Sequence, residues 1–279
     1  MEALDKISDY KLNSNVEFHM QDSIESYITY LNMLSELSPR ECEIFLNTLK
    51  NNEIINNQEM EHEDPFMVQL ELELECSKGK KNTSIDIMTN SILENKPLTI
   101  RKIEQLHRLI IHGTCDDKPE NYKIRDKQAY VSETTNGIEK VCYYAPNPEE
   151  IKPYLNKILE FLNSDDNKKE QDILYNSILT HFYIAALQPF GNGNTRLARL
   201  IEYGSIFKLS REVLGSKIKS PALFVSKNYL MTRASYRNNI SKLVNEPTDD
   251  SFNNWMNYNL NMVDEQIYFC NNILKKRFK

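Results

Sequence analysis

A short run rich in glycine and asparagine, residues 188–199, constrains the fold more than any other part of the sequence. It reads Gln-Pro-Phe-Gly-Asn-Gly-Asn-Thr-Arg-Leu-Ala-Arg and holds two of the seven glycines in a chain of 279 residues. In a chain so poor in glycine, Gly191 and Gly193 indicate a tight turn or a close approach of the backbone to a ligand. The apolar spacing that follows predicts a helix over residues 197–207, so the turn lies at a helix N-terminus.

This run has the composition of an anion-binding turn. The first N–H groups of a helix lack partners inside the helix, and the dipole of the helix is positive at that end. Arg196 and Arg199 are three residues apart, so they share a helical face from which guanidinium groups can hold phosphate oxygens. The sequence therefore predicts a phosphate-binding turn that leads into a helix.

The run resembles the signature of the Fic (filamentation induced by cAMP) family, which is His-Pro-Phe-x-Asp/Glu-Gly-Asn-Gly-Arg-x-x-Arg. It departs from that signature at Gln188, where the family has histidine, at Asn192, where it has an acid, and at Thr195, where it has a second glycine. The resemblance implies a mainly α fold, the Fic-fold helical bundle with a small β-hairpin flap. The matching positions are Pro189, Phe190, Gly193, Asn194, Arg196 and Arg199.

The resemblance implies an AMP transferase (AMPylation, or adenylylation) that moves AMP from ATP to a Ser, Thr or Tyr hydroxyl of a protein. The family histidine acts as general base, whereas the carboxamide of Gln188 can position a hydroxyl but cannot take its proton. Mg²⁺ is expected at Asn192, and only weakly, because a neutral carbonyl oxygen is a poorer ligand than a carboxylate. The side chain of Thr195 leaves open which phosphate is attacked. The nucleotide-binding residues implied are Gly191, Gly193, Asn194, Thr195, Arg196 and Arg199.

Three functions stay open at this point. In the first, the chain is an AMP transferase whose activity is impaired by Gln188. In the second, it is an inactive pseudoenzyme of the Fic fold that binds a nucleotide or a protein partner. In the third, it is a structural helical domain with a vestigial turn. His181, seven residues before Gln188, is expected to be a buried structural histidine, because two helical turns separate it by about 10 Å from the site.

Two short strands are predicted over residues 127–132 and 141–144, joined by a polar turn at residues 134–137. An ordinary surface hairpin has the same pattern. In the Fic family, however, such a hairpin follows a pair like Ile124-Arg125 and holds the target protein by strand addition. The resemblance therefore implies a target-docking flap at Gln128, Ala129, Tyr130 and Val131.

The rest of the sequence is predicted to be mostly helical. Ser38 and Glu41 form a capping box for a helix over residues 39–50. Residues 67–75 alternate leucine or valine with glutamate or glutamine, and strand and helix both stay open there. We expect an N-terminal helical region over residues 1–90 and a Fic domain with C-terminal helices over residues 91–279. Further helices are predicted over residues 23–37, 83–95, 99–112, 151–163, 173–187 and 228–244, and an apolar stripe runs over residues 252–274.

Many Fic proteins carry an inhibitory helix whose glutamate pairs with the second arginine of the signature. Residues 51–57 resemble the surroundings of that motif, with Ile55 where the glutamate belongs and Asn51 and Asn56 beside it. A rival alignment uses residues 21–26 and keeps the glutamate as Glu25. A third interpretation, two ordinary surface helices, is equally open.

Composition limits the classes of partner that the chain is expected to bind. The net charge of −6 argues against nucleic-acid binding, which needs a concentrated basic face. No apolar stretch has membrane-spanning length and no leader resembles a signal peptide, so we expect a cytoplasmic protein, with secretion into a host cell left open. The five cysteines are scattered, so neither a disulfide framework nor a zinc site is indicated. The expected partners are ATP or another nucleotide and a protein target at the flap; a homodimer is left open.

Overall fold

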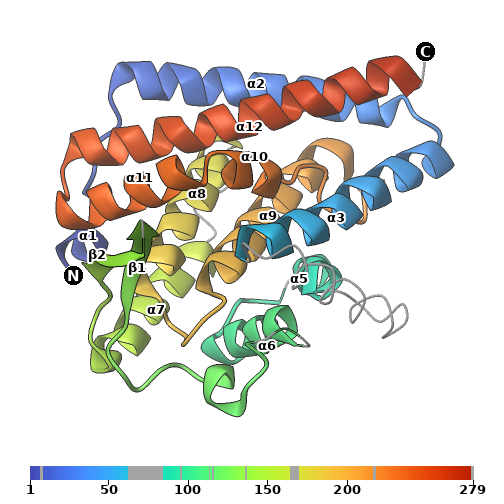
Figure 1. Cartoon of the computed structure of the whole chain (residues 1–279). Helices are drawn as coiled ribbons and strands as arrows, with labels where there is room; N and C mark the ends of the chain where they lie inside the picture. The colour runs from blue at the N-terminus through green and yellow to red at the C-terminus, as the bar shows by residue number, and fades with distance from the viewer. Residues whose placement is uncertain are drawn as a thin grey trace.

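The protein is described by a computed structural model for residues 1–6, 9–61, 84–94, 96–112, 114, 116–135, 137–163, 170–215 and 218–277. Helices make up most of the described residues, with one small antiparallel sheet (Figure 1). In that sheet β1 (Tyr130–Thr135) pairs with β2 (Ile138–Tyr144), and Tyr130 lies opposite Tyr144. The predicted fold class, a helical bundle with a small hairpin, is confirmed.

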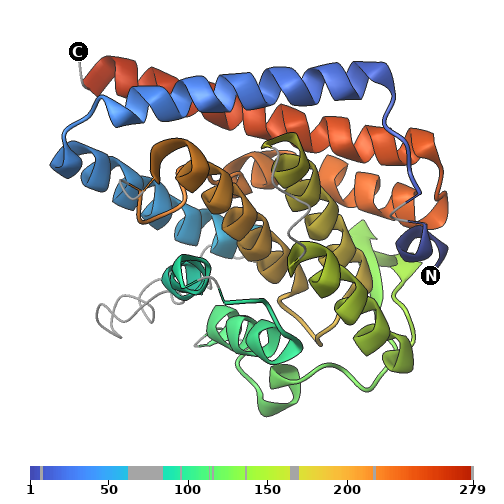
Figure 2. The ribbon, with the colours of Figure 1, turned by 180° about the vertical axis from the view of Figure 1, so that it is seen from behind.

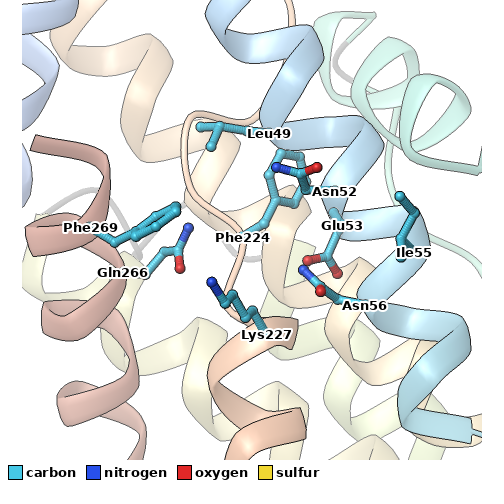
Figure 3. Close-up of a pocket in the computed structure, with 9 residues that line it drawn as sticks. All are labelled: Leu49, Asn52, Glu53, Ile55, Asn56, Phe224, Lys227, Gln266 and Phe269. Atoms are coloured by element: carbon cyan, nitrogen blue, oxygen red, sulfur yellow. The ribbon is translucent and has the colours of Figure 1, made fainter. Parts of the chain in front are cut away.

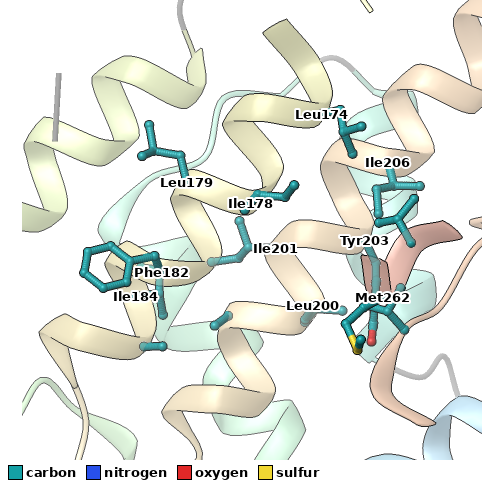
Figure 4. Close-up of a cluster of buried hydrophobic side chains, with 14 of the residues drawn as sticks. Leu174, Ile178, Leu179, Phe182, Ile184, Leu200, Ile201, Tyr203, Ile206 and Met262 are labelled. Carbon is teal, nitrogen blue, oxygen red and sulfur yellow. The ribbon is translucent and has the colours of Figure 1, made fainter. Parts of the chain in front are cut away.

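Two long helices form the centre of the molecule. These are α8 (Glu170–Leu187) and α9 (Asn194–Leu214), which follow each other in the chain and pack closely together (Figure 2). Apolar side chains from both helices, such as Ile178 and Ile201, are fully or almost fully buried between them (Figure 4). Helix α8 has apolar residues all round, as expected of a helix covered on every side. The short turn between the two helices contains residues 188–193.

The other helices surround this pair. Helices α2 (Ser14–Ser35) and α12 (Asp249–Arg277) lie side by side along one side of the molecule (Figures 1 and 2). Because α12 also contacts α8 and α11, the C-terminal apolar stripe closes the core. The remaining elements are α1 (Glu2–Asp5), α3 (Pro39–Glu61), α5 (Ser84–Leu93), α6 (Ile100–Ile111), η1 (Pro119–Tyr122), α7 (Pro148–Asn163), α10 (Ser226–Met231) and α11 (Arg233–Asn245).

Helix starts follow the capping chemistry of the sequence. The capping box before α3 is confirmed, because the backbone N–H of Ser38 donates to Glu41 Oε2 over 3.0 Å and the backbone N–H of Glu41 faces Ser38 Oγ at 3.4 Å. Helix α2 begins at Ser14 rather than residue 23, since the side chain of Asn13 caps it by accepting the N–H of Val16.

Helices are expected over residues 228–244, and the structure has two there, α10 and α11, which meet at Thr232. Residues 67–75, for which strand and helix were both open, lie outside the described residues. None of the helices in the described ranges has both the length and the apolar character needed to cross a membrane.

Candidate active site

The turn between α8 and α9 is held together by the side chain of Asn194. Its Oδ1 accepts the backbone N–H of Phe190 over 2.9 Å, while its Nδ2 donates to Phe190 O over 3.0 Å and to Gln188 Oε1 over 2.9 Å. The expected nucleotide contact at Asn194 is therefore confined to its backbone, because the side chain is used within the turn.

Gly193 is the residue that lets the turn enter α9. It has φ +74°, and a Cβ atom built on it would lie 2.8 Å from Ile111 Cγ2 and 3.2 Å from His107 Nε2. A side chain at this position would therefore be both strained and crowded. Gly193 is also the N-cap of α9 and makes no side-chain cap hydrogen bond. A glycine at the N-cap leaves room for an anion at this end of the helix, where the dipole of the helix is positive.

A carboxylate lies beside this helix end. Asp116, in the segment between α6 and η1, accepts a hydrogen bond from Asn192 Nδ2 at Oδ1 over 2.6 Å. Its Oδ2 accepts from Arg196 NH2 over 2.7 Å. The side chain of Arg196 is 5% exposed and that of Asp116 is 14% exposed. Sequence reasoning missed Asp116, because no motif marks it and only the fold brings it to the turn.

Gln188, the first residue of the turn, has a left-handed backbone. Its φ of +47° is the only positive value at a non-glycine residue among the described residues. Its Nε2 donates to Ala185 O over 2.6 Å, and its Oε1 accepts from Asn194. The side chain is half-buried. These hydrogen bonds orient the amide, which has no basic nitrogen.

Arg125 connects the turn to both ends of the flap. Its guanidinium group donates to Gln188 O over 2.6 Å, to Lys127 O over 2.7 Å and to Pro146 O over 2.6 Å. Its backbone N–H donates to Pro189 O over 3.0 Å. Because Lys127 and Pro146 flank the hairpin, this one buried side chain fixes the flap relative to Gln188.

The flap residues predicted to dock a target lie at the start of the hairpin. Tyr130 is 50% exposed and Val131 is half-buried. Gln128 Nε2 donates to Ala145 O over 2.6 Å, and the N–H of Ala145 donates to Ala129 O over 3.0 Å. Helix α11 lies against β2, whereas in the described part of the chain no third strand pairs with β1. The edge of a sheet that has no neighbouring strand presents backbone N–H and C=O groups that are not paired within the sheet.

His107 supports the turn from α6. Its ring stacks on Phe190 with centroids 3.8 Å apart, and its Nε2 lies 2.7 Å from Asn192 O. Burial lowers the pKa of His107 to about 4. The ring is therefore neutral at pH 7, with the Nε2 proton donated to the backbone oxygen of Asn192.

This buried neutral histidine predicts a pH dependence of stability. Between a folded pKa of about 4 and the ordinary 6.5, the unfolded chain binds the proton and the folded chain does not, so stability falls as the pH drops through this range. A pKa difference of this size corresponds to about 3 kcal/mol. Urea unfolding of His107→Gln at pH 7.5 and 4.5 should show a smaller loss on acidification than the parent chain. An equal loss in both would show that His107 does not contribute.

His181 is part of a buried polar network under the site. Its Nδ1 lies 2.7 Å from Glu202 Oε2, and its Nε2 lies 2.8 Å from the hydroxyl of Tyr236. All three side chains are buried, so the network joins α8, α9 and α11 away from solvent. This is the structural role predicted for His181, although its partners are side chains rather than backbone groups.

Arg199 is fully buried, and an acid from α3 lies on the same side of α9. Glu53 is 1% exposed, and its Oε1 accepts the hydroxyls of Tyr203, over 2.6 Å, and Ser226. Burial first, and then the charge of Glu53, holds the pKa of Tyr203 well above its usual range, while the positive charge of Arg199 opposes them. Glu53 and Arg199 therefore both lie near the Tyr203 hydroxyl.

The structure places Glu53, rather than Ile55, against the motif helix. Ile55 is 37% exposed, because a residue two positions further along a helix points away from the buried face. Asn51 is exposed and Asn56 is half-buried, and Glu25 of the rival alignment is exposed on α2. Among residues 39–56 of α3, the buried side chains are those of Phe45, Leu46, Leu49 and Glu53. The apolar stripe of this helix, continued by one helical turn beyond Leu49, therefore leads to Glu53.

Ile55 and Asn56 instead line a cavity of about 250 Å³ between α3, α10 and α12 (Figure 3). Its lining includes Glu53 and none of the residues of the turn at 188–193. In the lining of this cavity, Lys227 Nζ lies over the ring of Phe269, 4.6 Å from the ring centroid. The residues around it are Leu49, Asn52, Glu53, Ile55, Asn56, Phe224, Lys227, Gln266 and Phe269.

The donor set at the turn does not fit a magnesium ion. Asn192 Oδ1, the oxygen expected to bind it, accepts the N–H of Gly193 over 2.8 Å. Both carboxylate oxygens of Asp116 accept hydrogen bonds as well. In the part of the chain that the structure describes, no group of three or more His, Cys, Asp and Glu side chains is placed to hold a metal. Mg²⁺ prefers several free oxygen ligands in octahedral geometry.

Comparisons with known proteins identify this region. Residues 97–203 match the family model of the Fic/DOC family. A Fic family protein from Desulfovibrio desulfuricans G20 superposes with a TM-score of 0.63 at 12% identity, over 95% of this chain and 76% of that one. A Fic domain containing signaling protein from Bacteroides thetaiotaomicron VPI-5482 gives a TM-score of 0.64 at 15% identity, over 91% of this chain and 98% of that one. Fic-1 from C. elegans gives a TM-score of 0.52 at 17% identity, over 99% of this chain and 72% of that one.

No curated protein matches the sequence. The structural likenesses, at such low identity, establish the fold. The family match covers α6, the flap, α7, α8, the turn and the first half of α9, which are the elements that build the site. The chain therefore has the Fic fold, and its residues 97–203 form a domain of the Fic/DOC family.

Proposed function

We propose that the turn between α8 and α9 binds ATP and that the domain transfers AMP, slowly, to a Ser, Thr or Tyr hydroxyl of a protein. The observation that carries this proposal is the N-terminus of α9, which has no side-chain cap and has the Arg196 guanidinium beside it. Oriented N–H groups and a guanidinium group are what a polyphosphate needs for binding and for stabilising charge during transfer.

In the proposed reaction, the acceptor oxygen attacks the α-phosphorus of ATP, and the bond from that phosphorus to the bridging oxygen of the β-phosphate breaks. The products are an AMP ester and pyrophosphate. Gln188 orients the acceptor hydroxyl, and the proton leaves to a phosphate oxygen or to water because no side-chain base is in place. Loss of general-base assistance lowers the rate by about 10²–10⁴-fold.

The acceptor segment binds at the flap. The outer edge of β1 supplies backbone N–H and C=O groups for strand addition, as in other complexes in which a peptide extends a sheet. Arg125 holds this edge and the backbone of Gln188 together through its hydrogen bonds to Lys127 O, Pro146 O and Gln188 O. A segment on β1 would therefore be held in a fixed position relative to Gln188.

A second function, nucleotide binding without transfer, is favoured by the hydrogen bonds that already engage the side chains of Gln188 and Asn192. Gln188 is not a base, and both ends of its amide already accept or donate a hydrogen bond. Asn192 is likewise engaged at both ends. A chain with these substitutions retains the anion site and the flap, so it can act by binding a nucleotide or a partner protein without modifying it.

Helix α3 is proposed to regulate nucleotide binding, whichever of the two functions the domain has. Glu53 brings a buried negative charge to the side of α9 that carries Arg199, the second arginine of the signature. In this arrangement Glu53 competes with the terminal phosphate for the field of Arg199. The residue that acts in this way is Glu53; on the same helix Asn51 and Ile55 are exposed and Asn56 is half-buried.

Arg196→Ala tests nucleotide binding. Removing a charge-assisted hydrogen bond and leaving the Asp116 carboxylate beside the phosphates should weaken ATP binding by about tenfold to a hundredfold, measured by calorimetry. Arg211→Ala, at the other end of α9, is the matched control and should bind as the parent chain does. Unchanged affinity in Arg196→Ala would show that ATP does not bind at this turn, whereas a parent chain that binds no ATP would leave only a structural role for the domain.

A further inference from the structure

We propose that Asp116 is an internal competitor of the nucleotide: its carboxylate occupies a phosphate position on Arg196 and Asn192, and ATP binds by displacing it without needing magnesium. The inference rests on the proposed function, because it concerns the same anion site. It goes further in naming the group that blocks the site and in removing the metal from the binding step.

The first support is that Asp116 is bound as an anionic ligand would be. Each of its oxygens accepts one hydrogen bond, from Asn192 Nδ2 at 2.6 Å and from Arg196 NH2 at 2.7 Å. Carboxylates and phosphates offer guanidinium groups the same kind of charged oxygen acceptor. A phosphate that binds Arg196 must therefore replace Asp116 or share the guanidinium with a second negative charge.

The second support is the neutral residue at 192. Asn192 Oδ1 accepts the N–H of Gly193, so the amide presents its NH₂ group to Asp116. An acid at 192 would place two carboxylates within hydrogen-bond distance and would repel Asp116. Asn192 and Asp116 therefore suit each other, and the departure from the family signature is explained by this contact.

The third support is that release of Asp116 requires only a side-chain rotation. The backbone of Asp116 is anchored, because its O accepts from Asn121 Nδ2 over 2.9 Å and its N–H donates to Thr114 Oγ1 over 3.2 Å. The next residue, Asp117, faces elsewhere and contacts His112 and Tyr122. The carboxylate of Asp116 can thus leave Arg196 while the surrounding segment stays in place.

The test compares Asp116→Asn with Asp117→Asn as the matched control, using calorimetry with ATP and with inorganic tripolyphosphate, each in Mg²⁺ and in EDTA. Asp116→Asn keeps the shape and removes the competing charge, so both ligands should bind about tenfold to a hundredfold more tightly than to the parent chain. Asp117→Asn should match the parent. Mg²⁺ should leave the affinities of all three proteins unchanged within about twofold, because the donor set does not fit the ion.

Other outcomes overturn the inference in distinguishable ways. Equal affinity of the parent and Asp116→Asn, with both binding ATP, rejects the competition and leaves the proposed function standing. Weaker binding by Asp116→Asn, together with tighter binding of the parent in Mg²⁺, would show that Asp116 is a metal ligand. If no variant binds either ligand while circular dichroism shows that all are folded, the proposed function fails as well.

Discussion

Gln188→His is expected to raise the rate of AMP transfer by about 10²–10⁴-fold, because it restores a general base beside the acceptor hydroxyl. The backbone at this position is suited to the change. Histidine is enriched among non-glycine residues with positive φ, and Gln188 has φ +47°. The measurement is the mass of the purified chain after incubation with ATP, in which each transferred AMP adds its mass to a Tyr, Ser or Thr.

The control is Gln188→Asn, which keeps an amide, tolerates positive φ and provides no base, and it should remain as slow as the parent. The double variant Gln188→His with Glu53→Gln removes the buried charge near Arg199 and should be faster than Gln188→His alone. If Gln188→His gains nothing over the parent chain, and the double variant gains nothing either, the domain is a binder and the transferase proposal is wrong.

The parts of the site that are local in sequence could be predicted from it. The turn at residues 188–193, the helix after it and the hairpin all have short-range signals: paired glycines, helical apolar spacing, and strands around a polar turn. The Ser38–Glu41 capping box has the same kind of signal and is confirmed. Such features are determined by neighbours a few residues apart, so a single sequence contains the information they need.

The acids Asp116 and Glu53, which lie near the two arginines of the turn and of α9, could not be predicted in the same way. Asp116 reaches Asn192 and Arg196 only because α6 packs against α9. Glu53 reaches Tyr203 from α3, and a one-sequence alignment to an inhibitory motif favoured Ile55, which is exposed. Helical phase decides between these two residues, and the phase of α3 is set by what it packs against rather than by the motif.

The buried network under the site predicts the largest effect on stability. Glu202→Ala should lower the free energy of unfolding by about 3–5 kcal/mol, because it removes one member of a fully buried pair and leaves His181 Nδ1 without its partner. It also opens a cavity between α8 and α9, which adds to the loss. Urea unfolding followed by circular dichroism measures this difference.

The chain contains a matched control for that experiment. His19 Nε2 lies 2.8 Å from Asp264 Oδ2, a similar distance, but these two side chains are 21% and 35% exposed. Since solvent screens the pair, Asp264→Ala should cost only about 0–1 kcal/mol. A small loss in both variants would mean that the His181–Glu202 contact does not stabilise the central helices. A large loss of unfolding free energy in Glu202→Ala alone would show that the stabilisation comes from burial rather than from pairing a histidine with an acid. The buried network would then be what holds α9, and with it Arg196, in place.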